Sequence, residues 1–64
     1  MSIIEKLQKF DRALTVSELA GLLSMSRRTI YEHAAARRIP SMRIGSSVRF
    51  DPSAVAKWLQ DEQP

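Results

Sequence analysis

The clearest pattern in the chain is a stripe of apolar residues at helical spacing. Its members follow the i, i+3, i+4 and i+7 rule: Val16, Leu19, Ala20 and Leu23. Such a stripe predicts a helix with one side against a core. Thr15 stands three residues before Glu18, which is the pattern of a capping box, so we expect the helix to begin here. Gly21 weakens a helix by about 1 kcal/mol relative to alanine, and we expect another helix to pass close to it.

The same capping pattern occurs near the N-terminus. Ser2 stands three residues before Glu5, and the apolar residues Leu7 and Phe10 follow. We expect a short helix within residues 2–11, with its apolar side on the domain or on a second copy of the chain. The alternative is a frayed terminus, which is common at chain ends.

A second helix is expected soon after the helix that starts at Thr15. Ser26 is a residue type that caps helices, and Ile30 and Ala34 lie one turn apart on its inner side. We expect this helix to run from residue 27 to about 37. Pro40 then ends it, because the residue before a proline disfavours helical geometry. Two short helices joined by a tight turn are typical of a helix-turn-helix.

Residues 42–44 and 48–50 alternate between apolar and basic side chains, which is the periodicity of strands. Gly45 is expected in the turn between them, because glycine adopts positive φ without strain. In this register the apolar members face the core: Ile44, Val48 and Phe50. Arg43 and Arg49 then point away from the core together.

The last helix is expected to start at Asp51 and Pro52, which suit a cap and a first helical position. Val55, Trp58 and Leu59 follow as its buried stripe. Trp58 is expected to contribute more to the core than any other residue, because indole rings bury a large area.

Together these elements predict a small α+β domain. It is a winged helix-turn-helix with three or four short helices and a two-stranded β-hairpin as the wing. A chain of 64 residues has room for one domain. We expect an N-terminal extension with a short helix at residues 1–13, the winged helix-turn-helix domain at 14–60, and a flexible tail at 61–64.

The basic residues are concentrated in one part of the chain. Residues 24–50 hold six of the ten lysines and arginines but one of the seven acids, in a chain of net charge +3. Positive charge gathered on one surface favours a polyanionic partner, and we expect double-stranded DNA. The rival class is an adaptor whose basic surface meets an acidic protein.

In a helix-turn-helix, the N-terminal part of the second helix enters the major groove. Arg27 and Arg28 lie there, and arginine can donate two hydrogen bonds to guanine. Tyr31, one turn later, is either a groove contact or a core aromatic. Arg43 and Arg49 could reach phosphates or the neighbouring minor groove, unless they only protect a strand edge. The full set of candidate DNA-binding residues is Ser26, Arg27, Arg28, Thr29, Tyr31, Arg37, Arg38, Arg43, Ser46, Ser47 and Arg49.

Several function classes find no support in the sequence. There is no cysteine, and the single histidine, His33, is expected to pack rather than bind, so we expect no metal and no cofactor. No nucleophile has a plausible base beside it, and we expect no enzyme activity.

Binding of single-stranded nucleic acid needs stacking aromatics, and the four aromatic residues of this chain are expected mostly in the core. No apolar run approaches the roughly 20 residues of a membrane span, and the lack of cysteine fits a cytoplasmic protein. That it is nucleoid-associated in bacteria or phages is implied only by the family resemblance at residues 14–59.

At residues 14–59 the chain resembles the excisionase and MerR-like winged helix-turn-helix family of small DNA-binding domains. The matching motifs are, in order, LTVSELA, SRRTIY, IP, RIG, VRF, DP and VAKWL. The resemblance implies sequence-specific DNA binding, with the second helix in the major groove and the wing on the adjacent backbone or minor groove. It also implies groove contacts at Arg27, Arg28 and Tyr31, and wing contacts at Arg43, Ser46, Ser47 and Arg49.

Members of the family include excisionases (recombination directionality factors) of phages and mobile elements, and small prophage-type transcriptional regulators. The resemblance therefore implies an integrase, a recombinase or RNA polymerase as protein partner, and self-association on DNA. Family members commonly have glycine where this chain has Ser24 and again near Arg37. Because left-handed geometry is unfavourable for other residues, we expect the two turns to differ here. The wing tip, Ser46-Ser47, also lacks the basic residue common in the family.

Overall fold

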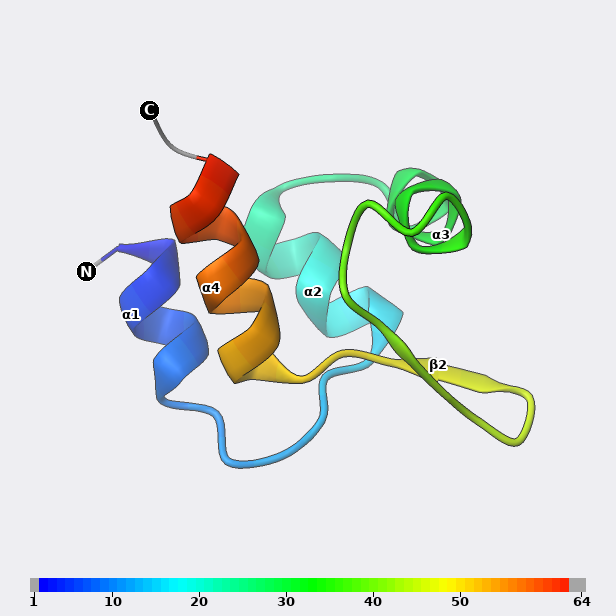
Figure 1. Cartoon of the computed structure of the whole chain (residues 1–64), viewed down its shortest axis with the longest axis horizontal. Helices are drawn as coiled ribbons and strands as arrows, with labels where there is room; N and C mark the ends of the chain where they lie inside the picture. The colour runs from blue at the N-terminus through cyan, green and yellow to red at the C-terminus, as the bar shows by residue number, and fades with distance from the viewer. Residues whose placement is uncertain (1, 63–64) are drawn as a thin grey trace.

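The computed structural model describes residues 2–62 (Figure 1). Within this range the chain forms four helices and one antiparallel hairpin. The elements are α1 (Ile3–Gln8), α2 (Val16–Leu23), α3 (Arg27–Ala35), β1 (Met42–Ile44), β2 (Ser47–Arg49) and α4 (Pro52–Glu62). The expected winged helix-turn-helix is confirmed, with α2 and α3 as its two helices and the hairpin as the wing. α3 ends about two residues earlier than the sequence predicted.

Both predicted capping boxes form. Ser2 Oγ accepts from the Glu5 N–H at 3.1 Å, and Glu5 Oε1 accepts from the Ser2 N–H at 3.4 Å. At the start of α2, Thr15 Oγ1 accepts from the Glu18 N–H at 3.1 Å, and Glu18 Oε1 accepts from the Thr15 N–H at 3.0 Å. Each box satisfies two backbone donors that a helix start otherwise leaves unpaired.

One core is shared by all the helices. Its buried apolar residues are Leu7, Leu14, Val16, Leu19, Ala20, Ile30, Ile39, Phe50, Val55 and Ala56. Phe50 is the largest fully buried side chain, whereas Trp58 is only half-buried at the edge of this core. Trp58, which was expected to contribute more to the core than any other residue, packs against the edge of this core rather than inside it. α1 packs along α4, and α2 packs against α3.

The N-terminal segment is part of the folded domain. Leu7 of α1 is fully buried in the same core as Phe50, so the chain on both sides of residue 14 contributes to one core. At the other end, α4 continues through Glu62, so Asp61 and Glu62 are helical where a tail was expected. The rest of that expected tail, residues 63–64, lies outside the described residues. Gly21 is exposed, and a Cβ added there would meet no atom within 4 Å, so no helix within residues 2–62 passes as close to it as the sequence predicted.

The hairpin register differs from the predicted one. Gly45 has φ 62° and Ser46 completes a two-residue turn, so β2 begins at Ser47. Facing pairs are Met42 with Arg49, Arg43 with Val48, and Ile44 with Ser47. Residues that face each other point to the same side of a ribbon. Arg43 therefore shares a side with Val48, Arg49 lies on the other side, and the prediction that both arginines point the same way is wrong.

Two backbone hydrogen bonds join the base of the hairpin to the helix-turn-helix. Leu14 donates to the Phe50 carbonyl at 2.8 Å, and Phe50 donates to the Leu14 carbonyl at 2.9 Å. Both side chains are fully buried. The hairpin is thus anchored beside α2 at its base, while its turn projects away from the helices (Figure 1).

Candidate nucleic-acid interface

Local chemistry fixes the start of α3. Ser26 Oγ accepts from the Thr29 N–H at 3.1 Å, and the two side-chain hydroxyls lie 2.8 Å apart. Ile30 is fully buried and anchors the inner side of the helix. Arg27 and Arg28 consequently lie on the solvent side of the first turn, and both are exposed.

Tyr31 belongs to this exposed surface. It is 52% exposed and lies one turn beyond Arg27. The prediction that Tyr31 is a core aromatic is therefore wrong, and its position on the surface is the one that a groove contact needs. The Arg28 side chain is 88% exposed, and its Nε lies 3.6 Å from the Glu32 carboxylate one turn later. Because an exposed pair of this kind contributes little, both side chains are free to rearrange toward a ligand.

The turn between α2 and α3 is left-handed at Ser24, which has φ 55°. Met25 donates to the Ala20 carbonyl at 2.9 Å, and Ser24 donates to the Gly21 carbonyl at 3.4 Å. These two bonds are those of a Schellman motif. The motif leaves three residues between the end of α2 and the start of α3, and the two helices are in contact.

α3 ends with the same motif. Arg37 has φ 60°, Arg38 donates to the His33 carbonyl at 2.9 Å, and Arg37 donates to the Ala34 carbonyl at 3.1 Å. The expected difference at these two turns is not found, because Ser24 and Arg37 both adopt left-handed geometry without being glycine. Arg38 also approaches the half-buried His33 ring, with Nη1 3.5 Å from Nδ1.

A hollow separates the end of α3 from the hairpin. It has a volume of about 550 Å³ and is lined by Ala34, Ala35, Arg37, Ile39, Pro40, Ser41 and Arg43. A smaller hollow of about 210 Å³ continues it along α3, where Tyr31 and Val48 join Arg43 and the two alanines. The short alanine side chains leave this space open. Two guanidinium-bearing residues and no acid line it, so it suits an anion.

The structure brings some candidate residues together and separates others. Arg27, Arg28 and Tyr31 share the exposed surface of α3, and Arg37 and Arg43 line the adjoining hollow. Arg49 lies on the other side of the ribbon, where its Nη1 donates to the Val48 carbonyl at 2.8 Å. The remaining candidates lie at the helix start, after the helix and at the wing tip: Ser26, Thr29, Arg38, Ser46 and Ser47.

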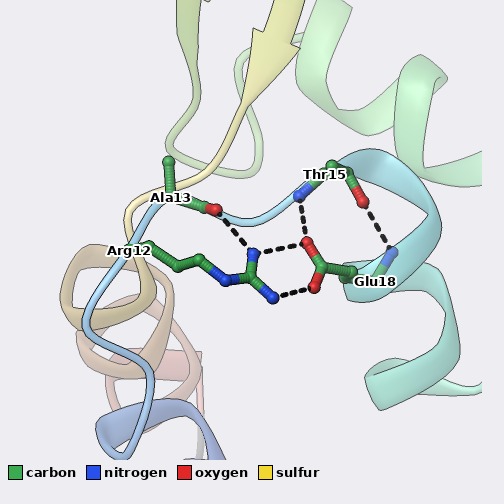
Figure 2. Close-up of polar contacts among 4 residues, drawn as sticks. All are labelled: Arg12, Ala13, Thr15 and Glu18. Atoms are coloured by element: carbon green, nitrogen blue, oxygen red, sulfur yellow. Dashed lines mark hydrogen bonds and ion pairs between the residues drawn. The ribbon is translucent and has the colours of Figure 1, made fainter.

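One ion pair that sequence analysis missed holds the segment before α2 (Figure 2). Arg12 Nη1 donates to Glu18 Oε1 at 2.9 Å and to the Ala13 carbonyl at 3.2 Å, while its Nη2 donates to Glu18 Oε2. The hydrogen bonds from Arg12 and from Thr15 lower the pKa of Glu18 to about 2, and the Glu18 carboxylate raises the pKa of Arg12. The Arg12 guanidinium also lies 5.6 Å from the centre of the Phe10 ring. No local sequence pattern predicts this pair, because the two residues are six positions apart and meet only through the turn of the chain before α2.

Two further features of residues 2–62 bear on function. In this range, no group of three histidine, aspartate or glutamate side chains could hold a metal ion. Each helix described is too short, or too polar, to cross a bilayer.

Known proteins with similar sequences were found. The sequence profile of the helix-turn-helix domain family matches residues 13–63. Two candidate DNA-binding proteins of Mycobacterium tuberculosis, from strains CDC 1551 / Oshkosh and ATCC 25618 / H37Rv, are each 33% identical to the chain over 57 residues. That alignment covers 89% of this chain and 73% of either relative. No solved structure matches the chain.

Proposed function

The chain belongs to the helix-turn-helix domain family, and we propose that it binds double-stranded DNA through α3 and the hairpin. The observation that carries the proposal is the exposed set Arg27, Arg28 and Tyr31, next to a hollow lined by Arg37 and Arg43. The names of its two mycobacterial relatives as candidate DNA-binding proteins support it.

In this proposal the first turn of α3 enters the major groove. Arg27 and Arg28 reach base edges, where arginine can donate two hydrogen bonds to guanine O6 and N7. Ser26 caps the Thr29 N–H at the helix start, and the N–H groups before it in the first turn attract phosphate. These contacts give both orientation and sequence preference, because phosphate contacts position a protein and base contacts specify the site.

The hollow between α3 and the hairpin receives one DNA strand. Arg37 and Arg43 then flank its phosphates, with Arg38 nearby, while Ser46 and Ser47 at the wing tip approach the backbone or the minor groove. Neutralising several phosphates releases counterions, so affinity falls steeply as salt rises. No chemical step is involved: the protein binds DNA and acts by its position there.

For the biological role we propose that of an excisionase of a phage or mobile element. The support is the resemblance of residues 14–59 to that group, and the protein partner would then be an integrase or recombinase. The alternative is a small prophage-type transcriptional regulator that works beside RNA polymerase. A domain of this size makes few base contacts, so in either role several copies on repeated sites would raise specificity.

The direct test is the double substitution Arg27→Ala with Arg28→Ala. Loss of two groove contacts should weaken binding to a selected duplex by roughly 100-fold, since each good arginine contact is worth about 1–3 kcal/mol. The melting temperature should not fall, because both side chains are exposed. A matched control is Lys6→Ala with Lys9→Ala, which removes the same charge from exposed positions of the N-terminal segment and should leave binding nearly unchanged.

Two results would contradict the proposal. Equal losses in both double variants would mean that net charge alone attracts DNA. Undiminished duplex binding by the arginine variant would mean that α3 makes no groove contact and would favour the adaptor, whose basic surface meets an acidic protein. Competition with single strands of the same sequence provides a further check, because the duplex should win by a wide margin.

A further inference from the structure

Glu32 is an acid in the middle of a basic surface. It lies on α3, one turn after Arg28 and directly after Tyr31, and its side chain is 64% exposed. It is also the only acid in residues 24–50, where six arginines are found. Nothing in the packing requires it, because the inner side of the helix is held by Ile30.

An acid at this position opposes the proposed binding unless it meets a hydrogen-bond donor. Its charge repels the phosphates that the neighbouring arginines attract. Its ion pair with Arg28 spans 3.6 Å between two exposed side chains, which contributes too little to explain the residue. Within the major groove, however, a carboxylate finds donors in the exocyclic amino groups of bases.

Cytosine matches a carboxylate better than adenine does. On its major-groove edge cytosine presents the N4 amino donor, whereas adenine presents an N7 acceptor beside its N6 donor. An acceptor-only group such as ionised glutamate is repelled by N7 but not by cytosine. A glutamine side chain, with a donor and an acceptor, would instead match adenine.

We propose that Glu32 determines sequence specificity by accepting a hydrogen bond from the N4 amino group of a cytosine close to the guanine read by Arg28. The inference rests on the proposed function and names the class of duplex that it selects. Four residues along a helix span about 6 Å, and successive bases of one strand lie about 3.4 Å apart. The two bases should therefore lie within about two base pairs of each other.

The experiment is selection of bound duplexes from a random pool, followed by titration of individual duplexes, for the wild-type chain and Glu32→Gln. The wild type should select a cytosine near a guanine. Glu32→Gln should select adenine at the cytosine position, lose about tenfold in affinity for the wild-type site, and gain affinity for duplexes that lack this cytosine. The control Glu62→Gln makes the same charge change at the end of α4, far from α3 (Figure 1), and should keep the wild-type preference.

Three outcomes would overturn the inference. Glu32→Gln could bind every duplex more tightly with unchanged base preference, which would mean that Glu32 only repels phosphate. It could lose the guanine preference and keep the cytosine, which would mean that Glu32 only orients Arg28. The wild type could bind no duplex at all, which would refute the proposed function as well. Equal melting temperatures for the variants would exclude misfolding as the cause of any change.

Discussion

At the scale of single residues, the most informative positions are the two non-glycine residues with left-handed backbone. Ser24 and Arg37 have φ 55° and 60°. Left-handed geometry brings Cβ close to a carbonyl oxygen and is unfavourable by about 1–2 kcal/mol for residues other than glycine. Both residues complete Schellman motifs whose hydrogen bonds compensate in part. The one at Arg37 also lies beside the proposed DNA strand.

Glycine substitutions at these two positions should separate stability from binding. Ser24→Gly and Arg37→Gly should each raise the free energy of unfolding by about 0.5–1 kcal/mol, since relief of strain exceeds the added entropy of the unfolded chain. Ser24→Gly should leave duplex affinity unchanged. Arg37→Gly should lower duplex affinity several-fold. It should also reduce the slope of log affinity against log salt concentration by the amount that one phosphate contact contributes. Urea unfolding measures the stability of each variant, and salt titrations measure its affinity for the duplex. An Arg37→Gly protein that binds DNA as tightly as the wild type would show that Arg37 is not part of the interface.

Glu18 makes stability depend on pH. Hydrogen bonds from Arg12 and Thr15 lower its pKa in the folded state to about 2, from an ordinary value of 4.5. A carboxyl group whose pKa is lower in the folded state stabilises the protein at pH values above its pKa in the unfolded state. That stabilisation is lost as the pH falls toward its pKa in the folded state. Wild type should therefore be more stable than Glu18→Gln at neutral pH, and the difference should disappear between about pH 4.5 and 2. Arg12→Gln should lose most of the same pH dependence, and a difference that stays constant down to pH 2 would contradict this account.

Residue-level predictions from sequence succeeded where the controlling interactions are local. The capping boxes at Ser2 and Thr15 could be predicted because each involves residues three positions apart. The ion pair of Arg12 with Glu18 could not, because it depends on how the chain before α2 turns back. The empty space beside Gly21 depends on tertiary packing, which the sequence pattern of one helix does not reveal.

At the scale of elements, the hairpin shows how one residue of turn length changes an interface. The alternation of apolar and basic residues predicts a three-residue turn, which would pair Arg43 with Arg49. The turn has two residues, and positive φ at Gly45 alone is consistent with a type II′ turn. A shift of one residue in register moves side chains to the opposite side of a strand. Ile44 is consequently 61% exposed rather than part of the core.

The register predicts unequal roles for the two wing arginines. Arg43 lines both hollows beside α3, whereas Arg49 lies on the opposite side of the ribbon and donates to the Val48 carbonyl. Arg43→Gln should therefore weaken duplex binding several-fold and lower the salt dependence by about one phosphate, and Arg49→Gln should change both much less. Salt-dependent titrations of the two variants measure the difference. The reverse order of effects would mean that DNA approaches the other side of the hairpin.

At the scale of the whole molecule, the parts differ in their tasks. α1 and α4 lie side by side at one end, while α3 and the hairpin lie at the other (Figure 1). A chain of this size buries only about 60% of its unfolded surface, and the core accordingly draws on every helix, including Leu7 of α1. The order of elements could be predicted from sequence because each carries its own start and stop signals. The packing of α1 on α4 could not, because its apolar side was equally suited to a second copy of the chain.

Chemical-shift mapping of the labelled protein against a mixed-sequence duplex tests the central claim most directly. The account predicts that the backbone amide signals that move belong to residues 26–32, 37–38 and 43–47, and that those of α1 and α4 stay in place. Signals that move mainly on α1 and α4, or that do not move at all under low salt, would contradict it.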